Sequence, residues 1–133
     1  MATLKSTLFF LMAIVVASME FNSSMATEHV VGDSFGWAVP QNDGFYANWS
    51  LHQTFKTNDV LVFNFPTGLH TVAKVTKAAY DSCNLQNPIS IHTTGPARIT
   101  IDSTGNHYYI CTIGQHCNSF LKLAITVAAR TNN

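Results

Sequence analysis

Charges, cysteines and long hydrophobic runs are all scarce in this sequence. Its 133 residues include seven Lys and Arg and seven Asp and Glu, so the formal net charge is zero with histidine neutral. No basic stripe predicts contact with nucleic acid, and no polybasic segment predicts binding to an anionic membrane surface. After residue 26 no apolar run is long enough to cross a bilayer, and the polar end at 129–133 is unlike a lipid-anchor signal. We therefore expect neither a nucleic-acid partner nor stable membrane insertion.

The first 26 residues have the pattern of a secretory signal peptide. A weakly positive start at Lys5 precedes an apolar run at 8–17, and Ser24-Met25-Ala26 places small residues around a cleavage position. The pattern predicts a signal peptide at 1–26, cut after Ala26, and a secreted product located outside the cell or in the cell wall. The rest of the chain is long enough for one domain, 27–129, followed by a short polar tail, 130–133.

Short apolar segments separated by turn residues make up most of this domain. The segment 60–65 is apolar except for Asn64, as expected of a strand covered on both faces, and the odd-numbered residues of 121–127 are all large and apolar. Six to eight short strands with one or two helical turns predict an all-β sandwich of two sheets. The segments expected as strands are 28–31, 60–65, 71–75, 89–91, 98–101, 107–111 and 121–127, and those expected as short helices are 46–51 and 76–80.

A thiol and an imidazole lie five residues apart near the end of the domain, at Cys111 and His116. Three cysteines allow at most one internal disulfide, so one thiol remains to stay inert, react, pair between chains or bind a metal. His70 follows a loop after a predicted buried strand and can supply a second imidazole, although spacing alone ranks it only slightly above His92 and His107. Two imidazoles and one thiolate form the trigonal ligand set of a blue-copper site.

The remaining histidines are less suited to this set. His107 precedes Cys111 by four residues on one predicted strand, which places it on the same face but roughly 13 Å away. That separation is too large for a shared metal ion. His29, His52 and His92 lie in or near predicted turns, and we expect them to be solvated.

Two disulfide pairings are open to Cys117. A bond to Cys111 would consume the candidate metal ligand within a six-residue loop. A bond to Cys83 would leave Cys111 free and close a loop with 33 intervening residues, which is worth roughly 3–4 kcal/mol in the chain-entropy model. The residues therefore favour the pairing of Cys83 with Cys117.

Several motifs together resemble the phytocyanins, the plant blue-copper branch of the cupredoxins. The segment Tyr109-Ile110-Cys111-x4-His116-Cys117, with His70-Thr71-Val72 upstream, is a specific signature, and the likeness covers nearly all of 28–127. The other segments that carry it are Val31-Gly32-Asp33, Gly36-Trp37, 46–49, Phe55, Asn58-Asp59, 61–65 and Tyr80-Asp81-Ser82-Cys83-Asn84.

The resemblance implies a Greek-key sandwich with one type 1 copper ion near one end, held by His70, Cys111 and His116. It also implies a disulfide between Cys83 and Cys117. One position departs from the family pattern, which places a weak axial ligand, Met or Gln, five residues after the second histidine. This chain has Leu121 there, expected over the copper as a non-donating or very weak neighbour, and Phe120 at the preceding position, where the family usually has Gly.

The predicted function is that of a secreted type 1 copper protein that carries one electron at a time and catalyses no reaction. A single mononuclear site cannot deliver the four electrons that reduce oxygen to water, which argues against a copper oxidase. The alternative is a copper-free extracellular or cell-wall interaction module of the early-nodulin-like type, and the three retained ligands argue against it. We expect a monomer whose partners are small redox molecules or a redox protein. Asn48-Trp49-Ser50 further predicts glycosylation at Asn48.

Overall fold

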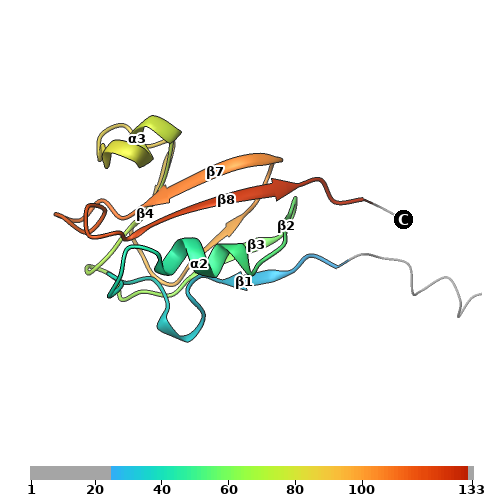
Figure 1. Cartoon of the computed structure of the whole chain (residues 1–133), viewed down its shortest axis with the longest axis horizontal. Coiled ribbons are helices and arrows are strands. Elements are labelled where there is room, and N and C mark those ends of the chain that lie inside the picture. The colour runs from blue at the N-terminus through green and yellow to red at the C-terminus, as the bar shows by residue number, and fades with distance from the viewer. Residues whose placement is uncertain (1–24, 132–133) are drawn as a thin grey trace, which may run out of the picture.

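The computed structural model describes residues 25–131, which form eight strands in two sheets (Figure 1). The first sheet has the order β1-β3-β6, and the second has the order β2-β8-β7-β4-β5. The strands are β1 (Glu28–Val30), β2 (Phe55–Lys56), β3 (Val60–Phe63), β4 (Val72–Val75), β5 (Ser90–His92), β6 (Ala97–Thr100), β7 (Gly105–Ile110) and β8 (Lys122–Ala128). The two-sheet sandwich predicted from the sequence is confirmed. Residues 1–24 of the expected signal peptide lie outside the described residues.

Most neighbouring strands are antiparallel, and two pairs near the chain ends are parallel. β1 runs parallel to β3, with His29 opposite Leu61, and β2 runs parallel to β8, with Phe55 opposite Val127. These parallel pairs attach the start and the end of the domain to different sheets. Both described chain ends lie at the same end of the molecule, on the right in Figure 1, where Arg130 donates to the Met25 carbonyl.

Buried and exposed residues alternate along β8, and the buried ones form one side of the core between the sheets. Leu123, Ile125 and Val127 are buried, whereas the residues between them are partly or fully exposed. The same core cluster contains an aromatic group in which the Trp37 ring lies 4.9 Å from Phe63, and Phe63 lies 5.6 Å from Tyr109, between ring centroids. Burial of these large apolar surfaces is the main favourable contribution to folding.

Two short helices and a 3-10 turn, η1 (Asp33–Phe35), connect the strands. Helix α2 (Phe45–Leu51) turns Trp49 into the core, and helix α3 (Lys77–Ser82) begins where the Thr76 hydroxyl accepts a hydrogen bond from the Ala79 N–H at 3.2 Å. α3 ends at Cys83, whose left-handed backbone (φ 52°) stops the helix.

A disulfide fixes α3 to the loop between β7 and β8. It joins Cys83 to Cys117, with 5.8 Å between their Cα atoms, and leaves Cys111 as a free, buried cysteine. Apolar residues under α3 form a second, smaller core, which consists of Ala73, Val75, Ile110 and Cys117, with Ala79, Tyr80, Cys83, Leu85 and Tyr108 packed against it. The covalent link and this packing hold the 111–121 loop against the sheet.

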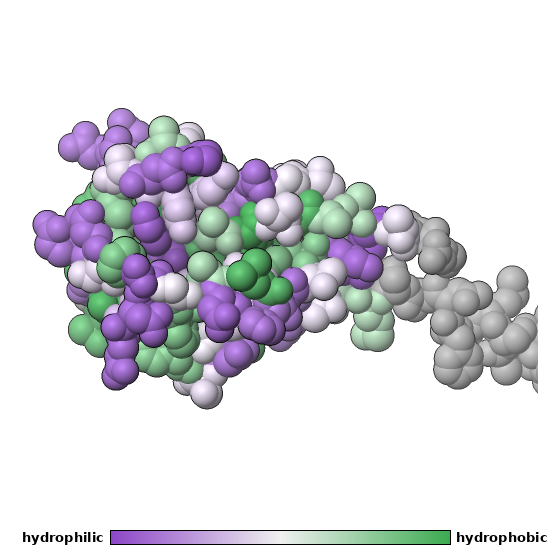
Figure 2. All heavy atoms as spheres, in the orientation of Figure 1, coloured by the Kyte–Doolittle hydropathy of each residue, from purple (hydrophilic) through white to green (hydrophobic). Residues whose placement is uncertain are grey.

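The surface of the described domain mixes hydrophilic and hydrophobic residues, as the face in Figure 2 shows. Single large apolar side chains, such as Leu51 and Ile89, are exposed on it, which is normal for a soluble domain surface. None of the helices within 25–131 combines the length and the apolar character that a membrane crossing requires.

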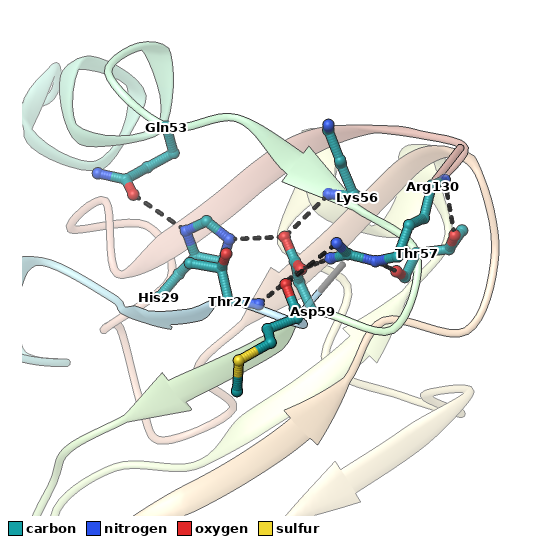
Figure 3. Close-up of polar contacts among 8 residues, drawn as sticks. Thr27, His29, Gln53, Lys56, Thr57, Asp59 and Arg130 are labelled. Atoms are coloured by element: carbon teal, nitrogen blue, oxygen red, sulfur yellow. Dashed lines mark hydrogen bonds and ion pairs between the residues drawn. The ribbon is translucent and has the colours of Figure 1, made fainter. Parts of the chain in front are cut away.

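His29 lies elsewhere than the sequence suggested. We expected this residue to be solvated near a turn, but it is 5% exposed on β1, with Nε2 2.9 Å from Asp59 Oδ2 and Nδ1 3.0 Å from Gln53 Oε1 (Figure 3). Asp59 and Gln53 lie 30 and 24 residues away in the sequence, so local pattern carried no signal for these contacts. His52 is exposed, as expected, and His92 is partly buried.

Candidate metal centre

The three predicted donor residues come together because β4 and β7 are antiparallel neighbours. Ala73 on β4 pairs with Ile110 on β7, so the start of one strand lies beside the end of the other. His70 lies just before β4, and Cys111 follows β7 directly. His116 belongs to the loop between β7 and β8. This loop lies at the end of the molecule opposite the described chain ends (Figure 1).

Thr71 connects the two strands at this point. Its backbone N–H donates to Cys111 Sγ at 3.4 Å, and its hydroxyl oxygen accepts the Thr112 N–H at 2.8 Å. The Thr71 hydroxyl also lies 2.7 Å from the Thr112 hydroxyl and 3.9 Å from Cys111 Sγ. On the other side, the indole N–H of Trp37 donates to the Thr71 carbonyl at 2.9 Å. These contacts fix the segment next to His70 relative to the sulfur.

The 111–121 loop is closed by its own backbone. The Cys111 N–H donates to the Leu121 carbonyl at 3.1 Å, and the Leu121 N–H donates to the His116 carbonyl at 3.0 Å. Phe120 has a left-handed backbone, φ 72°, a conformation that Gly adopts without strain and a residue with a Cβ does not. That geometry explains why Gly suits this position in the family pattern.

The donor atoms are spaced as a single metal ion requires. His70 Nδ1 and His116 Nδ1 are 3.1 Å apart, and Cys111 Sγ is 3.6 Å from His116 Nδ1. Two nitrogens at about 2.0–2.1 Å and a sulfur at about 2.3 Å from one tetrahedral ion would have N–N and S–N separations near 3.3 and 3.6 Å. One ligand atom from each of the three residues can be chosen so that all three lie within 4.8 Å of one another. The residues present therefore fit a mononuclear metal with one thiolate and two imidazoles.

Burial favours the ligating form of His70. Desolvation, together with the nearby His116, lowers the pKa of His70 below its ordinary value. A lower pKa keeps the imidazole neutral at neutral pH, and a histidine must be neutral to bind a metal ion. The Cys111 side chain is fully buried, whereas both imidazoles are partly exposed.

Within residues 25–131 these three side chains are the one group of three or more His, Cys, Asp and Glu residues close enough to hold a metal ion. The predicted residues are thus brought together, and His107 instead turns its Nε2 to the Ser103 carbonyl at 2.8 Å. Leu121 is fully buried in the same core cluster as Cys111. Thr71 is the functional neighbour that sequence reasoning missed; only its place beside His70 pointed to it.

Comparison with known proteins agrees with this geometry. The family model of the plastocyanin-like domain matches residues 37–120. Over 106 residues, 78% of this chain and 77% of the relative, the chain is 42% identical to the peeling cupredoxin of Cucumis sativus. The chain belongs to the phytocyanin family.

Two further relatives relate this phytocyanin to blue copper proteins. It is 40% identical over 129 residues to a blue copper protein of Arabidopsis thaliana, which covers 97% of this chain but only 64% of the relative's length. The solved structure of cucumber stellacyanin with Cu²⁺ at pH 7.0 superposes with a TM-score of 0.75 and 39% identity, over 80% of this chain and all of the other. The first of these relatives is named a blue copper protein, and the second was solved with Cu²⁺. His70, Cys111 and His116 supply the two imidazoles and one thiolate that a type 1 copper site uses.

Replacing Thr71 tests how the phytocyanin holds its two site strands together. In Thr71→Val the Thr112 N–H loses its acceptor in a mostly buried position, and a buried donor left without a partner costs about 1–3 kcal/mol. The Thr71→Ser control keeps the hydroxyl and should lose much less. Urea unfolding measures the difference, and equal midpoints for Thr71→Val and Thr71→Ser would show that the hydroxyl contributes nothing. The copper absorption band should remain in both variants, because each keeps the backbone N–H that points at Cys111 Sγ.

Proposed function

We propose that this phytocyanin is a secreted one-electron carrier that binds one copper ion through His70, Cys111 and His116, with Leu121 as a non-donating axial neighbour. The observation that carries the proposal is the convergence of the two Nδ1 atoms and Sγ, while the other two cysteines are joined to each other. When bound, copper supplies reversible one-electron chemistry between Cu(I) and Cu(II), for which two imidazoles and a thiolate are suitable donors.

The surrounding chain restricts movement of these donors. Thr71 and Trp37 fix the segment beside His70, and the backbone bonds between Cys111, Leu121 and His116 fix the loop. The disulfide attaches the same loop to α3 through Cys117. A ligand set that keeps one geometry in both oxidation states needs little reorganisation when an electron arrives or leaves, and this rigidity supports a carrier function.

Exposed apolar side chains near the two imidazoles suit brief contact with a redox partner. Leu69 precedes His70, and Ile113 and Phe120 belong to the loop that holds His116; all three are exposed. An apolar area with partly exposed imidazoles can be approached by a small redox molecule or a redox protein without long-range charge steering. The zero formal net charge of the chain agrees with this mode of encounter.

Secretion is supported by the signal-peptide pattern at 1–26 and by the disulfide, since disulfides persist mainly in oxidising compartments. In that environment Asn48 is a candidate for glycosylation because it is exposed on α2.

The visible spectrum of the purified protein with Cu(II) tests the proposal. We expect an intense blue thiolate-to-copper band that disappears in Cys111→Ser, because serine offers no thiolate. The control is His52→Gln, which changes an exposed histidine and should leave the band intact. A redox titration should then follow a one-electron curve. A colourless protein that binds no copper would overturn the proposal and favour the copper-free interaction module.

A further inference from the structure

A buried carboxylate lies at the end of the domain away from the metal centre. Asp59, in the turn between β2 and β3, is 1% exposed and receives four donors (Figure 3). Its Oδ2 accepts from His29 Nε2 at 2.9 Å and from the Lys56 N–H at 3.0 Å. Its Oδ1 accepts from the Arg130 guanidinium and from the Thr27 backbone nitrogen, the latter at 2.9 Å.

Thr27 attaches the start of the domain to the sheet. Its carbonyl accepts the Val60 N–H at 3.0 Å, and β1 starts at the next residue, Glu28. The residue itself is exposed, and its nitrogen donates to the buried carboxylate in a partly buried hydrogen bond. Met25 contributes a carbonyl that accepts from Arg130 Nη1 at 3.2 Å, and Arg130 also donates to the Thr57 carbonyl at 3.1 Å.

The expected signal cleavage falls on the bond before this nitrogen. Hydrolysis of the Ala26–Thr27 peptide bond by a signal peptidase consumes one water, leaves a carboxylate on Ala26 and creates an amine on Thr27 that is protonated at neutral pH. The atom that donates to Asp59 as a neutral amide would then donate as an ammonium. Hydrogen bonds between charged groups are roughly twice as strong as neutral ones.

We propose that Asp59 is the binding site for the α-ammonium group that removal of the signal peptide creates at Thr27. The proposal rests on the secretion included in the proposed function and goes beyond it, because it assigns the group that receives the new chain end. Cleavage thereby strengthens the attachment of β1 to the turn between β2 and β3, so that maturation itself stabilises the folded domain.

The other charged groups near Asp59 are compatible with this role. Arg130 retains its bonds to Asp59 and to the Thr57 carbonyl after Met25 leaves, and His29 stays between Asp59 and Gln53. The side chain of Lys56 points away from the carboxylate in Figure 3. Burial acts to raise the pKa of Asp59, but the hydrogen bonds from His29, Thr27 and Lys56 outweigh it and lower the pKa. The carboxylate is therefore ionised at neutral pH and ready to accept a cation.

The contribution of the new ammonium to folding stability decreases as the pH rises. An α-amino group has an ordinary pKa of about 7.7–8.0, and an adjacent carboxylate raises the value in the folded state. The added stability is therefore complete below the ordinary pKa and is lost as the pH rises through the raised, folded-state pKa. A chain with extra residues before Thr27 lacks this contribution, because its Thr27 nitrogen is an amide.

The test compares secreted proteins made from the full-length precursor. One precursor is unchanged, and the matched control carries a Gly-Ser insertion after Ala26, so that cleavage leaves the Thr27 nitrogen as an amide. Terminal sequencing should find Thr27 first in the unchanged product. We expect its melting temperature at pH 6.5 to exceed that of the insertion product by about 5 °C, and the gap to close by about pH 10.

Asp59→Asn, introduced into both precursors, should remove the difference between the two products. If the Asp59→Asn proteins do not fold, the pH dependence of the gap between the first two proteins still decides the matter. A product that begins elsewhere than Thr27, or a gap that is absent or unchanged between pH 6.5 and 10, would overturn the inference. Recording the blue band of each product separates this outcome from failure of the copper proposal, because the band does not depend on the chain end.

Discussion

Replacing both Cys83 and Cys117 by alanine should lower the free energy of unfolding by about 3–4 kcal/mol, as the chain-entropy model gives for a loop of this length. The two residues are 34 apart in sequence, so the bond removes many extended conformations from the unfolded chain. For a domain of roughly 100 residues such a loss corresponds to a fall in melting temperature of roughly 15–25 °C. Thermal unfolding of the metal-free protein measures it directly.

The double variant is the right comparison for this bond. A single replacement would leave an unpaired thiol in addition to the free Cys111, and a new pairing between the two would block the metal centre. Thiol titration of the unfolded proteins provides the control, because one reactive thiol is expected in both the parent and the double variant. A fall in melting temperature below about 4 °C, the shift for 1 kcal/mol, would show that the bond constrains the unfolded chain far less than its loop length implies.

The blue copper band of the same double variant distinguishes an effect on the unfolded chain from an effect on the folded metal centre. If the bond acts only on the unfolded chain, the folded metal centre is unchanged and the blue band keeps its position and width. Cys117 lies beside His116, and the segment containing both is attached to α3 by the bond. We therefore expect the band to broaden, because His116 gains freedom to move relative to Cys111.

Much of the fold was predictable because it depends on patterns that are local in the chain. Odd-numbered residues from Leu121 to Val127 alternate with more polar ones, and the observed strand buries that face. The helices 46–51 and 76–80 were placed within one or two residues of α2 and α3. The two-residue strand β2 and the turn η1 were missed, because segments this short have no measurable periodicity.

The candidate site was predictable in part for a different reason. Cys111 and His116 are close in sequence, so their association needs only one loop. His70 is 46 residues from His116, and it was identified by the family resemblance, because its spacing alone barely separated it from His92 and His107. The contacts of Thr71 with Cys111 and of His29 with Asp59 depend on strand register and on loops far apart in the chain. No single-sequence pattern fixes such contacts.

Replacing Leu121 by glutamine should lower the reduction potential of the copper centre. Leu121 is fully buried in the core cluster that contains Cys111, and its backbone bonds both to Cys111 and to His116. Its side chain has no atom able to donate to a metal ion, so a copper ion held by His70, Cys111 and His116 would gain no ligand from it, and a lower coordination number would favour Cu(I). A glutamine oxygen in its place would favour Cu(II), and axial ligation is a recognised determinant of the potential in such sites. Voltammetry of parent and variant provides the measurement.

The expected decrease in reduction potential has a definite size, and two other variants at position 121 provide the controls. For a one-electron couple each tenfold change in the ratio of the affinities for Cu(II) and Cu(I) shifts the potential by about 59 mV, and we expect a decrease of at least that amount. Leu121→Ile changes shape without adding a donor and should leave the potential nearly unchanged, whereas Leu121→Met, a weaker donor, should give an intermediate decrease.

The glutamine amide also needs a partner when copper is absent, so the metal-free Leu121→Gln protein should lose about 1–3 kcal/mol of stability and recover part of it on adding Cu(II). An unchanged or raised potential in Leu121→Gln would mean that residue 121 does not occupy the axial position.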